Sequence, residues 1–308
     1  MFKEWLKLGN FPILNKSGLR LRLLQLQFLY LFLRKPVRKR YPDFHHIQNS
    51  KGVIWISFNS WLRFQLQFID YRFWAGSPLI RAVALVNLSE TYEQDAKKLS
   101  REELQKIEKI GKKYADTFKT ISHSQFKNWI LRNYLIVNTF SDLDIKPTEN
   151  SECLVEIGPG LGAIISLSLN SKCKEIYSYD TFEMLSTFSA ITERYPKDYE
   201  RVKKISINDT RNVRPFKLSG KEITLLAFWS FTELTEEERI AYYDLFKSAK
   251  RIIIGTNEKF ESIDNFKYIE EMAKTLRMTI TWRALGDIFA TEIPAYQKKH
   301  RIYLLQDQ

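Results

Sequence analysis

A glycine-rich segment and a later acid in the second half of the chain have the spacing of a nucleoside-binding site. Residues 156–162 read EIGPGLG, so a glutamate precedes three alternating glycines. Glycine permits a tight turn and lets a ligand approach the backbone closely. Asp180 follows about 20 residues later, where a carboxylate can accept hydrogen bonds from both hydroxyls of a ribose. Because Ala163 follows the last glycine, the segment alone also fits the dinucleotide pattern G-x-G-x-x-A.

Alternating short apolar runs and amphipathic segments surround these residues and predict a parallel sheet. We expect strands over residues 154–157, 176–179, 202–207, 223–228 and 251–255. We expect helices over 161–169, 182–195, 235–249 and 263–276, and an antiparallel strand pair over 278–283 and 301–305. Such alternation places helices on both faces of a sheet. Ligands of these sheets bind beyond the carboxyl ends of the strands, where the glycine segment falls.

The segment EIGPGLG resembles the first motif of class I S-adenosylmethionine-dependent methyltransferases, in which an acid stands two residues before the first glycine. Nucleotide-binding Rossmann domains usually keep that position apolar. The resemblance implies a loop around the methionine part of S-adenosyl-L-methionine, formed by Gly158, Gly160 and Gly162, with Glu156 helping to hold it. It covers roughly residues 124–308 and implies a Rossmann-like class I methyltransferase sheet with helices on both faces.

Three further residues complete the cofactor site that this resemblance implies. Asp180 takes the ribose hydroxyls, although NAD enzymes share that feature, and Phe182 can pack on the adenine. Asp209 matches the family position near the third strand whose side chain receives the adenine amine. A turn-forming role for Asp209 stays open, because Asp often closes turns through its own side chain.

The segment after the fourth strand normally faces the transferable methyl group in this family, so it carries the identity of the acceptor. Adenine N6 methyltransferases have a proline-containing element there, yet no proline occurs in residues 219–268. C5-cytosine enzymes need a cysteine nucleophile, whereas Cys153 and Cys173 both precede the segment. Residues 230–234, SFTEL, are instead similar to the Ser-Phe-x-Glu-Met element of bacterial sugar O-methyltransferases, which act in making surface polysaccharides.

O-methylation requires a hydroxyl aligned with the methyl donor and a general base that takes its proton. Glu233 is the leading candidate for the base or for a hydroxyl anchor. The alternative is an acid that favourably precedes the helix capped by Thr235. His123 is the second candidate base, because it immediately precedes the helix that we expect Ser124 to cap and to end at residue 137. A structural role for His123 at the helix start stays open.

Two residues beside Glu233 are candidates for contact with the acceptor. Trp229 and Ser230 follow the fourth strand directly, and Trp229 with Phe231 forms either a sugar-stacking wall or part of the core. The remaining histidines, His45, His46 and His300, are further candidates for the base. No Asp and His cluster indicates a catalytic metal.

The basic excess of the chain lies in its first half. The 308 residues carry a formal net charge of +12. Residues 1–150 hold 25 Lys and Arg against 13 Asp and Glu, whereas residues 151–308 hold 23 of each. Helical patterns over 19–33, 79–93 and 100–118, with a helix or strand over 53–69, precede the sheet. We therefore expect a mainly helical basic region over 1–122 and an S-adenosylmethionine-binding domain over 123–308.

The first region has three open interpretations. Residues 23–33, LLQLQFLYLFL, are about half the length needed to span a bilayer, and their basic flanks suit peripheral contact with an anionic membrane. A core helix in a small lid is the second interpretation. Basic and aromatic residues interleaved over 55–73 also suit RNA. Without a secretory signal or a disulfide framework, we expect a cytoplasmic protein, peripheral at most to the inner membrane face, with a homodimer as one option.

These observations predict an S-adenosylmethionine-dependent methyltransferase that O-methylates a sugar hydroxyl in surface glycan or polysaccharide biosynthesis. Its acceptor would be a nucleotide-linked or lipid-linked sugar. One alternative is an RNA methyltransferase that binds RNA through the basic half. The other is a non-catalytic scaffold with a methyltransferase fold, which predicts that no cofactor binds.

Overall fold

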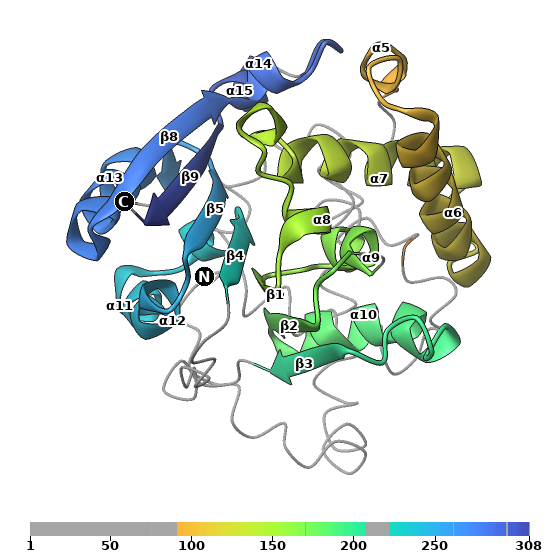
Figure 1. The fold of residues 1–308 in the computed structure, drawn as a ribbon, viewed down its shortest axis with the longest axis horizontal. Helices are drawn as coiled ribbons and strands as arrows, with labels where there is room; N and C mark the ends of the chain where they lie inside the picture. Colours follow the sequence, from red (N-terminus) through yellow and green to blue (C-terminus); the bar gives the residue numbers. More distant parts are fainter. Residues whose placement is uncertain are drawn as a thin grey trace, which may run out of the picture. The chain divides into compact units, whose positions relative to one another are not determined.

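The computed structural model describes residues 75, 91–169, 171–206, 222–260, 262–293 and 295–307 (Figure 1). All of them belong to the unit Tyr71–Gln308, one of two into which the chain divides. The segments expected over 19–33 and 53–69, most of the one over 79–93, and Asp209 lie outside the described residues. Among the described residues, no helix is long and apolar enough to cross a membrane.

Seven strands form one mixed sheet in the order β3-β2-β1-β4-β5-β9-β8. The strands are β1 (Cys153–Ile157), β2 (Glu175–Asp180), β3 (Val202–Ser206), β4 (Ile223–Phe228), β5 (Arg251–Thr256), β8 (Met278–Ala284) and β9 (Arg301–Asp307). The first five are parallel, whereas β9 runs antiparallel to both β5 and β8. The chain order reverses between β1 and β4, which is the switch point where such sheets bind ligands. The expected Rossmann-like α/β sheet and its antiparallel closing pair are confirmed.

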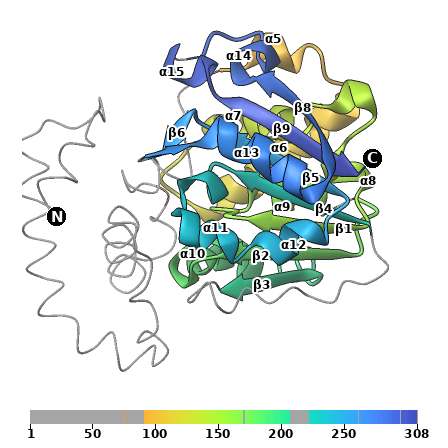
Figure 2. The ribbon, with the colours of Figure 1, turned by 90° about the vertical axis from the view of Figure 1, so that its left-hand side faces the viewer.

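Helices cover both faces of this sheet (Figures 1 and 2). On one face lie α11 (Glu236–Ile240), α12 (Tyr243–Lys247) and α13 (Asn265–Leu276). On the other lie α7 (His123–Val137), α9 (Ala163–Ser168) and α10 (Phe182–Arg194), with α6 (Arg101–Thr117) packed on α7. The shorter elements are α5 (Glu93–Ala96), α8 (Pro147–Asn150), α14 (Leu285–Ile288), α15 (Ala295–Lys298), β6 (Lys259–Phe260), β7 (Ile263–Asp264) and the 3-10 turns η3 (Ser141–Leu143) and η5 (Phe231–Glu233).

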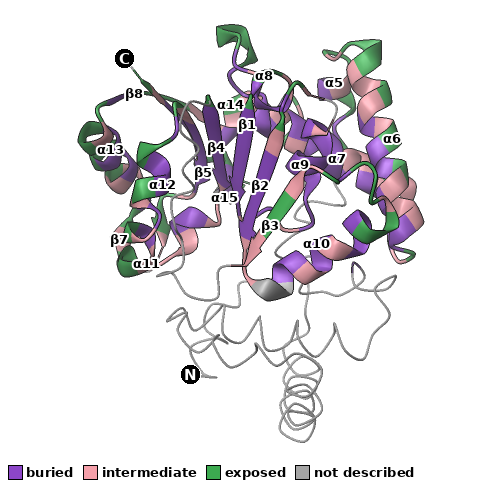
Figure 3. Ribbon diagram, turned by 60° about the horizontal axis from the view of Figure 1, so that its bottom comes forward, coloured by how far each residue is buried: buried purple, intermediate pink, exposed green. Residues whose placement is uncertain are grey.

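The central strands are buried on both faces, which explains their near-continuous apolar sequences (Figure 3). All five residues of β1 are buried, and so are the first five of β4. The edge strand β3 instead exposes Lys203 and Lys204. Glu156 is therefore the exception in the middle of the sheet, a charged residue type in a strand that is otherwise apolar.

Reciprocal side-chain caps begin the two helices that precede the sheet. Ser100 and Glu103 form a capping box at the start of α6, with hydrogen bonds of 2.7 and 3.2 Å. The expectation that Ser124 caps α7 is wrong, because Ser122 is the cap and exchanges hydrogen bonds with Gln125. Ser122 has the extended backbone that an N-cap requires. His123 is consequently the first residue of the helix rather than the residue before it.

The helix expected over 235–249 is divided into α11 and α12. Thr235 caps α11 as expected, in a capping box with Glu238. At residues 241 and 242 the backbone amides donate to carbonyls three residues back, so the α-helical pattern is interrupted there. The interruption lets Tyr242 enter the core beside Phe231, with ring centroids 6.1 Å apart.

Aromatic side chains join α6 to α7, and so to the sheet domain. The Tyr114 ring lies 5.5 Å from Phe126 and 5.3 Å from Trp129, measured between centroids. The expected division at residue 122 therefore falls between two helices that pack on each other. As a division of function it remains a prediction.

Candidate functional site

The glycine segment between β1 and α9 has the backbone that only glycine adopts easily. Gly158, Gly160 and Gly162 have φ angles of 71°, 58° and 78°. A Cβ atom on Gly158 would lie 2.1 Å from the Cβ of Ser230, and one on Gly162 would lie 2.1 Å from the Phe188 ring. Conformation and space therefore both require glycine at these two positions.

Glu156 lies one residue from the end of β1 and is 3 % exposed. Its Oε2 atom is buried without a hydrogen-bond partner among the described residues. Burial, and then the charge of Asp180, raise the pKa of this carboxyl to about 8, although the Ile165 backbone amide opposes the shift. A buried acceptor with no partner is costly unless a donor or cation reaches it. The residue therefore fits a positively charged ligand beside the glycine loop.

The structure brings Asp180 to the same place. It ends β2, whose Tyr179 carbonyl accepts a 2.7 Å hydrogen bond from the amide of Gly158. The Asp180 carboxylate accepts the Thr181 amide at 2.7 Å and remains partly exposed. Glu156, the first glycine and Asp180 thus meet at the carboxyl edge of the sheet, as expected. Phe182 begins α10 beside them.

A network of hydroxyl groups supports the glycine loop from behind. Tyr114 of α6 donates to the Leu161 carbonyl at 2.6 Å and lies 3.0 Å from the Ser166 hydroxyl. Ser166 also donates to the Gly162 carbonyl at 2.8 Å, and its oxygen lies 2.6 Å from that of Tyr199. Sequence reasoning missed this support, because Tyr114 precedes Leu161 by 47 residues and carries no local signal.

Ser230, a candidate for substrate contact, lies directly against the loop. Its hydroxyl donates to the carbonyl of Ile157 at 2.5 Å, and its side chain occupies the space beside Gly158. The hydroxyl proton is therefore committed to the end of β1. Only the lone pairs of this oxygen remain for any other partner.

Trp229 joins a basic and aromatic group at the end of β4. Its φ of 62° is unusual for a bulky residue, and its amide donates to Gly255 at 2.7 Å. The indole N–H donates to Nδ1 of His300 at 3.1 Å, while the Arg132 guanidinium lies 5.7 Å from the ring centroid. Burial and then the Arg132 charge lower the pKa of His300 to about 4. His300 is neutral at pH 7 and carries its proton on Nε2.

This group was not apparent from the sequence. The sequence indicates His300 only as one of four candidate bases and does not indicate its contact with Trp229, which it follows by 71 residues. Arg132 lies in α7 as one basic residue among many. Strain at the Trp229 backbone is typical of functional sites, because such conformations persist only where the surroundings hold them.

Glu233 ends the 3-10 turn that follows β4. Burial raises the pKa of its carboxyl to about 7, and the carboxylate forms no hydrogen bond or ion pair with the rest of the described chain. Arg239, which is 1 % exposed, donates to the carbonyls on either side, Thr232 at 2.5 Å and Leu234 at 3.0 Å. It also donates to Asn265 at 2.7 Å. Arg239 thus holds the turn that carries Glu233, a role that the sequence did not reveal.

His123 is held on the surface between α6 and α7. Its Nε2 lies 3.1 Å from Glu108, which also binds Lys127 at 2.7 Å, and its side chain is 41 % exposed. Within the described part of the chain, none of its hydrogen bonds or ion pairs involves the segments after β1 or β4. The structure therefore does not bring His123 together with Glu156 or Glu233 through a direct contact.

No protein-family model and no curated protein matches the sequence. The methyltransferase domain of bacterial CtHen1 is 14% identical, with a TM-score of 0.45, over 58% of this chain and 98% of that chain. An O-methyltransferase family protein from Burkholderia thailandensis is 8% identical, with a TM-score of 0.39, over 57% and 58%. The glycopeptide N-methyltransferase MtfA, solved with S-adenosyl-L-methionine, is 11% identical, with a TM-score of 0.40, over 52% and 83%. Because the sequence identities and TM-scores are this low, an activity can be inferred only from the residues of the site itself.

Proposed function

We propose that this chain is an S-adenosylmethionine-dependent methyltransferase. The observation that supports the proposal is the buried Glu156 carboxyl, which has an unsatisfied oxygen beside a left-handed glycine loop. A positive charge nearby favours the ionised form of a carboxyl group, so a cationic ligand would lower the pKa of Glu156. When bound, S-adenosyl-L-methionine supplies a methyl group on a positively charged sulfonium.

The described residues divide the binding of this cofactor among them. Glu156 and the glycine loop would hold the methionine part, and the partly exposed Asp180 would accept the ribose hydroxyls. For the adenine we keep Phe182 and Asp209 as proposals from the sequence. The hydroxyl network behind the loop donates hydrogen bonds to two of its carbonyls, those of Leu161 and Gly162. These bonds hold the loop in its conformation without a ligand.

For the acceptor we propose a sugar hydroxyl of a nucleotide-linked or lipid-linked glycan precursor. The SFTEL element, residues 230–234, supports this choice, and the half-buried Trp229 presents an aromatic ring of the kind on which sugars stack. Glu233 would take the hydroxyl proton. A base is most effective when its pKa is close to the working pH, and burial brings Glu233 to about 7.

The assembly and location of the protein are part of the same proposal. A lipid-linked acceptor would place the chain at the inner face of the cytoplasmic membrane, with its basic first half against anionic lipid. Membrane contact, a cytoplasmic location and a homodimer stay predictions. Catalysis by His123 stays the less favoured alternative, because its imidazole is paired with Glu108.

RNA methylation is the second candidate function, and the distribution of charge favours it. The excess of 12 positive charges, 25 against 13, lies wholly in residues 1–150. RNA binding through such a region would weaken steeply as salt is added, because phosphate contacts release counterions. The third candidate, a scaffold without catalysis, predicts no cofactor affinity.

Calorimetric titration with S-adenosyl-L-methionine separates the enzyme from the scaffold. We expect binding by the wild type and at least a tenfold loss in Asp180→Ala, because the ribose loses its acceptor. Asp244→Ala, which removes an exposed carboxylate on α12, is the matched control and should bind like the wild type. Absence of binding by the wild type would contradict the proposal.

A methyl-transfer screen with labelled cofactor then identifies the acceptor. Glycan precursors carrying a diphosphate linkage should accept the label, and total RNA should not. Transfer to RNA alone would contradict the sugar acceptor while leaving the methyltransferase proposal intact.

A further inference from the structure

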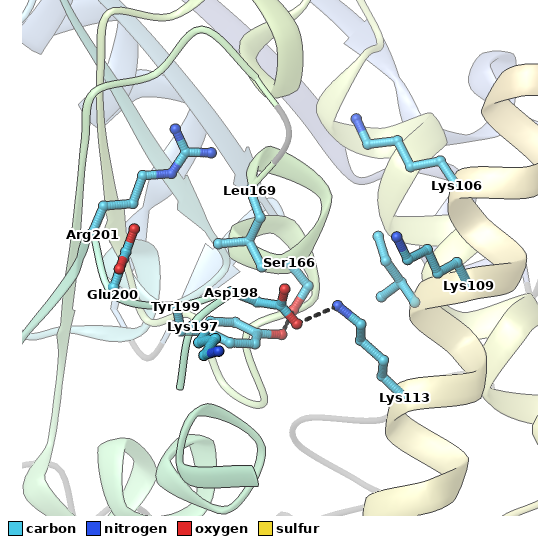
Figure 4. Close-up of a pocket in the computed structure, with 11 residues that line it drawn as sticks. Lys106, Lys109, Lys113, Ser166, Leu169, Lys197, Asp198, Tyr199, Glu200 and Arg201 are labelled. Atoms are coloured by element: carbon cyan, nitrogen blue, oxygen red, sulfur yellow. Dashed lines mark hydrogen bonds and ion pairs between the residues drawn. The ribbon is translucent and has the colours of Figure 1, made fainter. Parts of the chain in front are cut away.

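A pocket of about 320 Å³ lies between α6 and the segment that leads into β3 (Figure 4). Three lysines of one helix line its first wall: Lys106, Lys109 and Lys113. They are spaced by three and four residues, so they project from one face of the helix. The opposite wall is formed by residues 197–201, and Ser166 in α9 and Leu169 directly after it also line the pocket. The pocket thus lies behind the glycine loop rather than at the carboxyl edge of the sheet.

Positive charge predominates around this pocket. Five of its lining residues are Lys or Arg, against two carboxylates, Asp198 and Glu200. Figure 4 shows the lysines of α6 extending toward the segment that holds Asp198, to which Lys113 forms an ion pair. A concave site lined mainly by one sign of charge concentrates ions of the opposite sign.

Part of this charge is already used within the protein. Lys113 binds Asp198 at 2.6 Å, and Arg201 donates to the backbone carbonyls of Ser171 and Cys173. Lys106, Lys109 and Lys197 form no ion pair or hydrogen bond with any residue that the structure describes. Three ammonium groups on facing walls therefore remain available for a ligand.

Burial acts most clearly on Lys106 among the lysines of the pocket. Burial lowers the pKa of its ammonium group, and this effect exceeds the attraction of Glu149, Glu103 and Glu102. A bound anion would favour the charged form of this lysine.

The floor of the pocket is connected to the glycine loop. Ser166 and Tyr199 line it, and their oxygens lie 2.6 Å apart. The same Ser166 hydroxyl donates to the Gly162 carbonyl. These hydroxyl groups separate the pocket from the loop, so a ligand here would occupy a second site, distinct from the proposed cofactor site.

We propose that this pocket binds the phosphate or diphosphate group of a small ligand. Such a group has several negative charges and many acceptor oxygens, so it can bind three ammonium groups from facing walls at once. A single carboxylate would leave at least one lysine without a partner. The volume of about 320 Å³ suits a compact group rather than a long stretch of polymer. The proposal stands independently of the methyltransferase activity.

Calorimetric titration with inorganic pyrophosphate, without any cofactor, tests the site. Lys106→Gln with Lys109→Gln should weaken binding about tenfold, because two of the three available ammonium groups are lost. Lys112→Gln with Lys119→Gln removes the same charge from exposed positions in and just beyond α6 that do not line the pocket. This control should stay within about twofold of the wild type. Circular dichroism verifies that both variants are folded.

Three results would overturn the proposal. The first is no binding of pyrophosphate by the wild type at physiological salt. The second is an equal loss in both double variants, which would indicate general attraction rather than a site. The third is that the wild type binds a short RNA but not pyrophosphate, and that only the Lys106→Gln with Lys109→Gln variant loses RNA binding. This result would show that the pocket binds a polymer. Because no cofactor is present, each result is separate from failure of the methyltransferase proposal.

Discussion

The ends of β1 and β4 lie side by side in the sheet, yet they hold their glutamates in different ways. Glu156 belongs to a strand, and the loop after it is fixed by contacts with its neighbours on β2 and α9. Glu233 belongs to a 3-10 turn that a buried arginine six residues later holds in place. Desolvation raises the pKa of both carboxyls, although Glu156 is buried and Glu233 is only partly buried.

This difference separates two tasks. A carboxyl that is fixed in a strand beside a constrained loop is suited to holding a ligand. A carboxyl whose pKa is close to 7 is suited to exchanging a proton. We therefore expect substitutions at the β1 end to change cofactor binding and substitutions at the β4 end to change the chemical step.

The largest effect is expected for Glu233→Gln. Loss of the general base should lower methyl transfer roughly 10²–10⁴-fold while the affinity for cofactor is unchanged. The wild-type rate should rise with pH and level off above a pH of about 7, where Glu233 is ionised, and the variant should lose this dependence. Initial rates across pH measure both. Glu236→Gln, an exposed acid at the start of α11, should behave as the wild type; a variant at 233 that kept the wild-type pH profile would exclude it as the base.

Gly158→Ala should affect the other region. The new Cβ would lie 2.1 Å from the Cβ of Ser230, and the φ of 71° disfavours any side chain. We expect a loss of about 3 kcal/mol in the free energy of unfolding, measured with urea, together with weak cofactor binding. Adding Ser230→Gly removes the side chain that the new Cβ would contact, so it should restore part of the stability. The part lost to the unfavourable φ angle should remain lost. Equal stability of the single and double variants would show that Ser230 is not what the loop packs against.

The stability of the protein should depend on pH through Glu156. Its pKa is about 8 in the folded chain, above the value of 4.5 for a free glutamate, so the folded state keeps a proton that the unfolded state loses. The free energy of unfolding should therefore fall as pH rises from 4.5 toward 8, and level off above. Glu233 adds a change of the same sign up to about 7. Glu156→Gln should remove on the order of 5 kcal/mol of this fall across the whole range from pH 4.5 to 8; an unchanged profile would mean that Glu156 is ionised in the folded state.

The smallest effect is expected for Trp229→Phe. The variant removes the indole donor to His300 and should cost about 1 kcal/mol of stability. The pKa of His300, about 4 in the wild type, should rise, because its neutral form loses a hydrogen bond. NMR titration of the imidazole measures this value. An unchanged pKa would show that burial and Arg132 alone lower it.

The fold was predictable because its signals are local. Each expected strand lies within two residues of an observed one, since central strands read as short apolar runs. The glycine loop and Asp180 were also predictable, because the turn requires φ angles that glycine supplies. The start of α7 was misplaced by two residues, since Ser122 and Ser124 are both acceptable caps and only the partner Gln125 decides between them.

The supports of the site were not predictable, because they come from elsewhere in the chain. Tyr114 contacts the glycine loop from α6, and His300 contacts Trp229 from the position directly before β9. Arg239 reads in the sequence as an exposed residue of a charged helix, yet it is 1 % exposed. Such contacts depend on packing between distant elements, which hydrophobic periodicity does not encode.

Cofactor binding should release a proton from Glu156. If the cofactor places positive charge beside Glu156, the carboxyl must change from mostly protonated at pH 7 to ionised. Calorimetric titration with S-adenosyl-L-methionine in buffers of different ionisation enthalpy should show about one more proton released by the wild type than by Glu156→Gln. Equal proton release by the two proteins, or no binding by the wild type, would contradict the account.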